Sequence, residues 1–366
     1  MLQSFLFKIQ DHRRKQGQRY QLGYILLFTI FAILSGATSY RKVQAFIKAQ
    51  YPTLAQRFAL NWKRVPAYTT VRALSQGTSA AEVEATFRAY SACLAGSPLA
   101  LRGVAFDGKV LRGSFDHFQD QKAIQQLSAF LTDSHLILAH EEIAEKTNEI
   151  PTAQALSDAL GLSGCLFTFD ALHCPDKTLT VAQETGNEAL VQVKENQPTL
   201  FRDCQTVAET PSPTSVYQEP AAKAHHRIAR RRSEVFKPPT FSDSDKWQRV
   251  EAVVKVNRNR QSFDTKTKRW KPSQETSFDS ATTLLDAVTC GSTIRQHWGI
   301  ENRDHHVRDV TLGEDQSRIR TNPHLFAKLR SFALNILRAN KVENVSLELF
   351  NNCLNLSNIL NYVGVT

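Results

Sequence analysis

Three acidic residues stand out because each lies where chemistry could take place. Asp107 and Asp170 each follow an apolar run, and Glu301 lies in the stretch HWGIEN. We expect the aspartates at the ends of two strands and the glutamate on a helix that begins near Ser292 or Thr293. An isolated aspartate after a strand more often caps a turn, and spacing alone does not decide between the two interpretations.

If the three carboxylates meet, they need a cation, because they cannot all stay ionised side by side. Mg²⁺ is the natural cation, since it takes oxygen ligands. Two such ions, roughly 4 Å apart, would activate a water or a 3′-hydroxyl for phosphodiester chemistry. The sequence therefore allows a metal site for phosphoryl chemistry. The alternative is that the three acidic residues cap turns and bind no metal.

Basic, amide and aromatic side chains near the acids could contact a phosphate backbone or stack on a base. The alternatives are solvated turn charges for the cations, a core position for the tryptophan and a hydrogen-bonded structural role for His173. The candidates are Lys109, Arg112, Lys194, Asn196, Gln197, His297, Trp298 and Arg308.

The densest cationic patch of the chain is Arg227, Arg230, Arg231 and Arg232. Such a patch would bind phosphates with salt-dependent, largely sequence-independent affinity. A disordered basic loop is the competing interpretation. The whole chain of 366 residues carries 45 Lys+Arg against 35 Asp+Glu, a net charge of +10, which favours a polyanionic partner.

A membrane partner is not expected, because the sequence has neither a basic amphipathic helix nor a lipidation motif. The apolar run from Leu22 to Leu34 is too short to span a bilayer and predicts a helix buried on all sides. The six cysteines lie far apart without a CxxC pair, so we expect neither zinc nor disulfides, but reduced thiols in a cytosolic protein.

The pattern of apolar residues divides the chain into five parts. Residues 1–96 are expected to be helical, with Ser39 capping a helix that Pro52 stops and Thr69 or Thr70 capping the next. Residues 97–208 alternate strands and helices, and Gly108 is expected to turn the chain after the first strand. For residues 209–276 the pattern predicts a basic, β-rich insertion that contains a hairpin. We expect residues 277–340 to complete the core, with the helix of Glu301, and residues 341–366 to form a C-terminal helix. The predicted fold class is α/β with a mixed sheet.

Four ordered stretches carry a family resemblance: AFDGKVLRGS, TFDALHCPDKT, LVQVKENQPTL and IRQHWGIENRDHHVRDVTLGEDQSRIRTNPHLFAKLRSFALNIL. They resemble the transposases of the ISAs1 insertion-sequence family, also called H-repeat-associated proteins, within the wider IS4-type group. The N-terminal stretch DHRRKQGQRYQLGYILLFTIFAILSGATSY is similar to the domain associated with that family. The resemblance covers nearly the whole chain.

This resemblance implies a DDE transposase with a ribonuclease H-like core. Asp107, Asp170 and Glu301 would be the catalytic and metal-binding triad, holding two Mg²⁺ ions for which Mn²⁺ can substitute. The enzyme would bind the terminal inverted repeats of a transposon, cut by hydrolysis and join the 3′-hydroxyl to target DNA. A homodimer on DNA in the bacterial cytoplasm, associated with the nucleoid, is implied as well, together with a basic residue of the family at Arg308.

The chain departs from the family pattern at His306, where an aromatic is usual, and in HRIARR, which replaces a GRIE-like run. Glu314 and Asp315 are rival acids to Glu301, and we interpret them as capping or surface residues because Gly313 should end the helix. Two alternatives therefore stay open. One is a nuclease on the same core that does not join strands, and the other is a domesticated, non-catalytic DNA-binding protein.

Overall fold

The structure is a computed structural model that describes residues 1–96, 102–114, 123–143, 149–170, 176–209, 212–224, 226–238, 241–319 and 321–365. His173 and Cys174 lie outside these residues. The chain forms two compact units: a first unit of Met1–Ser97, Gly108–Ala144 and Ile300–Thr366, and a second unit of Pro98–Asp107 and Glu145–Gly299.

The first unit is mainly helical and also holds a two-stranded hairpin and the C-terminal half of the shared strand β1. Its helical segments are α1 (Leu2–Leu6), η1 (Lys15–Gly17), α2 (Leu22–Leu34), α3 (Tyr40–Phe58), α4 (Tyr68–Gly77), α5 (Ala80–Ala95), η2 (Arg112–Ser114), η4 (Ile300–His305), η5 (Val307–Thr311), α11 (Pro323–Ala339), α12 (Val345–Leu354) and α13 (Leu356–Leu360). The hairpin strands are β2 (Ile124–Leu131) and β3 (Leu136–Ile143), paired antiparallel.

Helix α2 lies at the centre of the first unit. Twelve of its 13 residues are buried, so it has no polar face to turn toward solvent. Helix α11 packs against α2, α5 and β3 and is itself buried from Leu325 to Leu337. The prediction of an all-round buried helix at 22–34 is confirmed. No helix among the described residues is long and apolar enough to cross a membrane.

Two helix boundaries differ from the expected ones. Pro52 does not stop α3, which continues to Phe58. The carbonyl of the exposed Lys48, which loses its partner to the proline, faces the solvent side of the helix, where water can replace the backbone bond. Helix α4 begins at Tyr68 after Ala67, one turn earlier than a Thr69 or Thr70 cap would place it. The Ser39 cap is confirmed, since its side chain accepts a hydrogen bond from the Lys42 N–H.

The second unit is built on a sheet with helices packed along it. Its elements are α6 (Glu149–Ala159), β4 (Cys165–Phe169), α7 (Asp176–Glu184), β5 (Glu188–Val193), α8 (Pro198–Val207), β6 (Ser215–Gln218), β7 (Ala222–Ala224), β8 (Arg227–Phe236), α9 (Ser244–Trp247), β9 (Ala252–Asp264), β10 (Arg269–Ala281) and α10 (Ala287–His297). Strand β1 (Arg102–Leu111) runs from this unit into the first. The strand order is β3-β2-β1-β4-β5-β10-β9-β8-β6, with β7 paired to β8.

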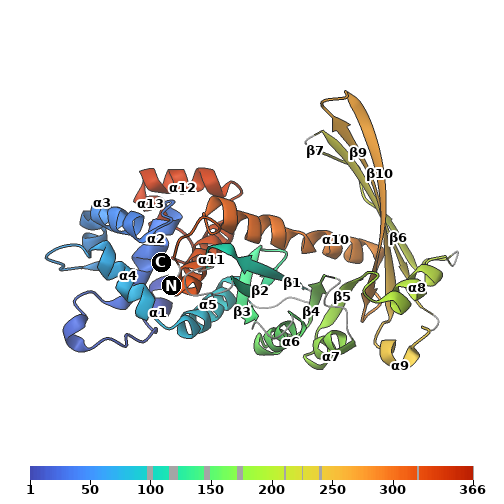
Figure 1. The fold of residues 1–366 in the computed structure, drawn as a ribbon, viewed down its shortest axis with the longest axis horizontal. Helices are drawn as coiled ribbons and strands as arrows, with labels where there is room; N and C mark the ends of the chain where they lie inside the picture. Colours follow the sequence, from blue (N-terminus) through green and yellow to red (C-terminus); the bar gives the residue numbers. More distant parts are fainter. Residues whose placement is uncertain are drawn as a thin grey trace. The chain divides into compact units, whose positions relative to one another are not determined.

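Strand pairing changes from parallel to antiparallel along this order. Strands β1, β4 and β5 are parallel neighbours, and β10, β9 and β8 follow as antiparallel neighbours. The strands of the predicted insertion thus continue the core sheet through the β5–β10 pair. Figure 1 shows β9 and β10 as a long twisted ribbon whose tip is the expected hairpin. The fold is mixed α/β, as predicted.

The first strand is longer than expected. Gly108 does not turn the chain, because β1 continues through Gly108 and Lys109 to Leu111. Alternating exposure along a strand places Asp107 and Lys109 on one face. Helix α10 also starts earlier than expected, at Ala287, because Asp286 caps it by accepting hydrogen bonds from the N–H groups of Val288 and Thr289.

Candidate active site and nucleic-acid interface

Asp107 and Asp170 lie side by side on neighbouring parallel strands. The register pairs Phe106 of β1 with Phe169 of β4, and the two rings stack with centroids 4.8 Å apart. Because side chains alternate between the faces of a strand, the next residue of each strand points to the opposite face. Asp107 and Asp170 therefore lie on the same face of the sheet, on neighbouring strands that are about 4.8 Å apart.

Both aspartates are half-buried, so a ligand can reach them from solvent. Two carboxylates at this spacing repel each other unless a cation or a proton lies between them. Their oxygens are the donors that Mg²⁺ and Mn²⁺ favour, so the pair fits a divalent metal site. No group of three metal-binding side chains occurs among the described residues, and the pair accounts for two of the three predicted ligands.

Helix α10 covers the face of the sheet on which the pair lies. His297, at its last turn, contacts Thr168 of β4 through an Nδ1–Oγ1 hydrogen bond of 2.8 Å. Thr168 is two residues before Asp170 and so lies on the same face of β4. Trp298 follows, half-exposed, with the guanidinium of Arg258 5.9 Å from the centre of its ring. Through Thr168, His297 lies near Asp170, whereas Trp298 lies near Arg258 of β9, both within the second unit.

A third aspartate lies on the same face of the sheet and was not singled out from the sequence. Val191 of β5 pairs with Phe169, so Gln192 is level with Asp170; Gln192 in turn pairs with Asp279 of β10. Asp279 is 5% exposed, and burial raises the pKa of its carboxyl to about 7 despite the nearby charges of Arg258 and Lys194. Its position inside the run TSFDSA gave no signal of this environment.

Glu301 lies in the first unit, on a π-helical segment. Segments η4 and η5 carry Glu301 and Arg308 through a wide i→i+5 helix, a rare form that is frequent at functional sites. Arg308, seven residues after Glu301, does not lie two ordinary α-helical turns beyond it, because the π-helix has a smaller angle between successive residues. Glu301 is exposed. The helix ends at Leu312, and Gly313 follows with a φ of +64°, as the glycine predicted.

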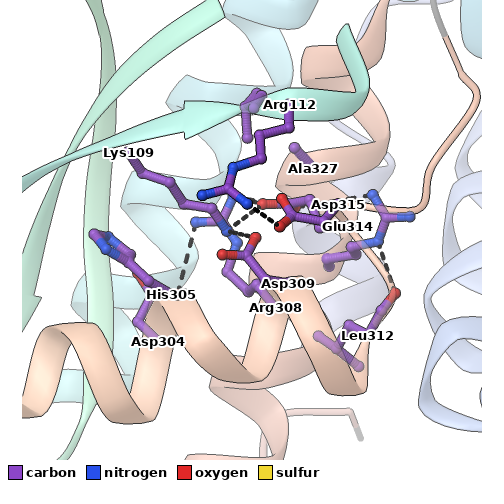
Figure 2. A network of polar contacts seen from close by, with 12 residues as sticks. Lys109, Arg112, Asp304, His305, Arg308, Asp309, Leu312, Glu314, Asp315 and Ala327 are labelled. Atoms are coloured by element: carbon purple, nitrogen blue, oxygen red, sulfur yellow. Dashed lines mark hydrogen bonds and ion pairs between the residues drawn. The ribbon is translucent and has the colours of Figure 1, made fainter.

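The first unit also contains a buried ionic network, shown in Figure 2. Lys109 of β1 contacts Asp309 at 2.6 Å and Glu314 at 2.7 Å. Arg308 contacts Glu314 at 3.0 Å and Asp304 at 3.7 Å. Arg330 of α11 donates to the Leu312 carbonyl and lies 3.8 Å from Glu314. We call Lys109, Asp304, Arg308, Asp309, Glu314 and Arg330 the buried network.

Glu314 is the centre of the buried network. Burial alone would raise the pKa of its carboxyl, but Arg308, Lys109 and Arg330 outweigh that effect and lower the pKa to about 2. The interpretation of Glu314 as a capping or surface residue is therefore wrong, since its side chain is 4% exposed and ion-paired. Only Asp315 has a surface position, beside the exposed Arg112 at 3.5 Å.

Two of the predicted DNA contacts are buried in this network. Arg308 is 0% exposed and Lys109 is 7% exposed, and both face carboxylates. A side chain whose charge is already neutralised inside the protein cannot reach a phosphate without breaking its own pairs. We therefore correct the assignment of Lys109 and Arg308 from DNA contacts to structural cations. Arg112, whose side chain is 77% exposed, keeps the geometry of a surface contact.

The predicted DNA-contact residues after β5 and on β8 differ in exposure and in the face of the sheet on which they lie. Lys194 and Asn196 are exposed in the turn that Gln197 closes by donating its N–H to the Lys194 carbonyl. On β8, alternation separates the arginines: Arg227 and Arg231 lie on the α10 side, whereas Arg230 faces away. The α10 side is identified by Gly291, where an added Cβ would meet the Ser233 hydroxyl. Because Arg230 lies on the opposite face of β8 from Arg227 and Arg231, a DNA segment that lies on one face of the strand cannot contact all three.

Comparison with known proteins gives the family. The chain matches the model of the transposase DDE domain over residues 99–337 and that of the DDE_Tnp_1-associated domain over residues 3–91. It is 28% identical to YbfL and 28% identical to YhhI of Escherichia coli K12, in each case over 91% of this chain and 89% of the relative. The name of YhhI describes a candidate H repeat-associated transposase.

A relative in Escherichia coli O157:H7, YncI, named a candidate transposase, is 25% identical over 92% of this chain and 87% of its own length. A solved piggyBac transposase synaptic complex with hairpin DNA aligns with 97% of this chain and 77% of its own, at 10% identity and a TM-score of 0.41, too distant for any argument. The family model matches well over half of the sequence, and its ribonuclease H-like core agrees with the mixed sheet described above. The chain belongs to the transposase DDE domain family.

Proposed function

We propose that this chain is a metal-dependent DNA transposase in which Asp107, Asp170 and Glu301 hold the metal ions. The observation that carries the proposal is the register of β1 and β4, which brings Asp107 and Asp170 to neighbouring positions on one face. DDE transposases act on DNA and use divalent metal ions in general, so a carboxylate pair at this position fits the family. The identity of the ions as Mg²⁺ follows from their preference for oxygen ligands.

Two links of the chain support Glu301 as the third ligand. Glu301 follows His297 by four residues, so their Cα atoms are at most about 14 Å apart, and His297 bonds Thr168 two residues before Asp170. In the first unit, Lys109 is ion-paired with Asp309, which belongs to the π-helix that carries Glu301. Lys109 is two residues from Asp107 on β1.

In this proposal each residue has a defined task. Asp107, Asp170 and Glu301 supply carboxylate oxygens; when bound, Mg²⁺ neutralises the scissile phosphate and favours deprotonation of the attacking hydroxyl. His297 keeps the end of α10 against β4 through Thr168. Trp298, whose side chain is half-exposed, offers a ring on which a base can stack. The first attack is hydrolysis at the transposon end, and the second is strand transfer by the freed 3′-hydroxyl.

In this proposal, backbone contacts to DNA come from cations and amides at the end of β5, on β8 and after β1. Lys194, Asn196 and Gln197 follow β5, which neighbours β4, and Arg227 and Arg231 lie on the α10 side of β8. Arg112 follows β1. Arg230 faces away from α10 and is not part of this interface. Because two transposon ends must be paired, we propose a homodimer on DNA, acting beside the nucleoid in the cytoplasm.

Strand cleavage and joining on end-containing DNA with Mg²⁺ tests the proposal. Asp107→Asn, Asp170→Asn and Glu301→Gln should each reduce cleavage to background and leave end binding close to wild type, because the phosphate contacts remain. Asp245→Asn, which changes an exposed carboxylate of the second unit, is the matched control and should cleave normally. A triad variant that cuts at the wild-type rate would remove that residue from the metal site.

The same assay separates the two rival functions. Cleavage without joined products would indicate a nuclease on the same core. Binding without cleavage by the wild-type chain, in Mg²⁺ and in Mn²⁺, would indicate a domesticated DNA-binding protein. Neither alternative has an observation in its favour beyond the departures at His306 and in HRIARR.

A further inference from the structure

A polar groove lies on the side of the ribbon that faces away from α10. Its volume is about 820 Å³, and one wall is α8, whose Phe201 meets Phe278 of β10 edge to face with ring centres 5.6 Å apart. The other wall is the surface of β8, β9 and β10. The polar side chains that matter on this wall are Arg230, Arg232, Lys255, Asn257, Asn259 and Gln274.

The ribbon side chains in the groove form repeated cross-strand rows. Arg230 pairs with Asn259, which pairs with Gln274, and these three make the first row. The second row repeats the pattern with Arg232, Asn257 and Thr276. Each row thus presents one guanidinium followed by an amide on the next strand. Row members pointing to one face are neighbours in space.

The spacing of the rows suits a repeating anion. Residues two apart on a strand are about 6.7 Å apart, and a DNA strand carries one phosphate per about 3.4 Å of rise. Because the phosphates wind around the axis, neighbouring ones lie farther apart in space than this rise. Arg230 and Arg232 can therefore meet two neighbouring phosphates of one strand, while the amides can bond sugar or base edges. Lys255, two residues before Asn257 on β9 and on the same face, adds a third cation.

Acidic neighbours reduce this charge without cancelling it. Glu234 accepts from Arg232 at 2.9 Å and from Asn257 at 3.4 Å, and Glu209 lines the rim. Arg230 is exposed. The groove faces away from the aspartate pair, because Asp107, Asp170 and Asp279 lie on the α10 side. A DNA segment in the groove is therefore a different segment from the one at the aspartates.

We propose that the groove between α8 and the ribbon binds a second DNA segment through its phosphate backbone, so that one chain holds two segments at once. The proposal rests on the proposed function, because it presumes that the first segment lies at the aspartate pair. It assigns Arg230, Arg232 and Asn259 to the second segment. Binding of this kind carries little sequence information and falls steeply with salt.

Energy transfer between two labelled DNAs tests this inference. A donor-labelled duplex is added to the full chain at a saturating concentration, and an acceptor-labelled duplex or single strand is then titrated. The double variant Arg230→Glu with Arg232→Glu should weaken capture of the acceptor DNA by about tenfold or more. The donor duplex should bind, and be cut, as by wild type. Comparing the duplex with the single strand shows which form the groove takes.

Two controls keep the result interpretable. Arg230→Lys with Arg232→Lys retains both charges and should keep most of the second binding. Lys266→Glu with Lys268→Glu makes the same charge change at the hairpin tip, outside the groove, and should leave capture unchanged. Far-ultraviolet circular dichroism on heating checks that each variant folds.

The inference is overturned if the wild type captures only one DNA, if the groove variant captures the second as wild type does, or if the tip variant loses capture equally. Failure of the proposed function gives another pattern: the wild type captures both DNAs but cuts neither in Mg²⁺ or Mn²⁺.

Discussion

The buried network of the first unit and the ribbon of the second unit are both rich in cations, yet they use charge in opposite ways. In the buried network, Lys109, Arg308 and Arg330 face the carboxylates of Asp304, Asp309 and Glu314 within the protein. On the ribbon, Arg230 and Arg232 stay exposed to solvent. The difference shows that a basic residue near an acidic triad is not by that fact a DNA contact.

The physical cause of the difference is desolvation. A buried cation must be matched by an anion at close range, because the cost of removing it from water is several kcal/mol. Once matched, it has no charge left for a phosphate. An exposed arginine keeps its hydration, contributes little to stability and can exchange counterions for a phosphate backbone. The buried network therefore holds the fold, and the ribbon is available for ligands.

Glu314→Gln should give the largest effect on folding. The change leaves Lys109, Arg308 and Arg330 without their shared partner in a buried position, and loss of one member of a buried pair costs about 3 to 5 kcal/mol. We expect the free energy of unfolding, measured by urea titration at pH 7, to fall by that amount. Glu275→Gln is the matched control on the ribbon, where the carboxylate is 52% exposed and faces Arg258 and Arg260. It should cost less than about 1 kcal/mol.

The same variant has a pH signature. The pKa of Glu314 is about 2 in the folded protein against 4.5 for the ordinary group. Its contribution to stability is present above pH 4.5 and is lost as the pH falls toward 2. The difference between wild type and Glu314→Gln should therefore shrink over that range. Equal losses for Glu314→Gln and Glu275→Gln at pH 7 would remove the contrast between the two regions.

Asp279→Asn should change the free energy of unfolding by less than Glu314→Gln does. It should stabilise the protein, and the gain should grow as the pH rises. Burial raises the pKa of Asp279 from 3.8 to about 7. The groups that face it are Arg258 on β9, Lys194 after β5 and the thiol of Cys290 on α10. The folded protein keeps a proton that the unfolded chain releases above pH 3.8, so this carboxyl lowers stability as the pH rises toward 7.

An asparagine at this position has no proton to lose. We expect Asp279→Asn to gain stability relative to wild type between pH 5 and pH 8, by at most about 3 kcal/mol, because the penalty in the wild type grows only until the pH reaches the folded pKa of about 7. Free energies of unfolding at the two pH values measure the gain. A constant difference between the two proteins would mean that Asp279 is already ionised in the fold at pH 5.

The sequence was sufficient for the elements whose pattern is local. Helix α2, the ribbon hairpin and the end of the helix at Gly313 were predicted, because apolar periodicity and turn residues act over a few positions. The side-by-side position of Asp107 and Asp170 has a similar origin, because each aspartate directly follows an apolar run and these two runs form neighbouring parallel strands. The triad as a whole stays a prediction.

What the sequence could not reveal depends on contacts between distant segments. Lys109 and Glu314 are 205 residues apart, and neither stretch shows that they meet. A cation after a strand and an acid after a helix look like surface residues until their partner is known. The buried position of Asp279 likewise depends on α10 covering β10, and the continuation of β1 past Gly108 depends on the neighbouring strands. Contacts between segments far apart in the sequence, and not the local composition, determine whether these residues are buried and where β1 ends.

Arg112→Ala should give the smallest effect on folding and tests where the buried network ends. Arg112 is exposed and lies 3.5 Å from Asp315, and an ion pair of this kind contributes about 0 to 1 kcal/mol. We expect the free energy of unfolding to change by less than about 0.5 kcal/mol. If Arg112 contacts a phosphate, the slope of log K for DNA against log salt should fall by about 1. A loss of stability comparable to that of Glu314→Gln, with an unchanged salt slope, would place Arg112 inside the buried network and leave β1 without a DNA contact.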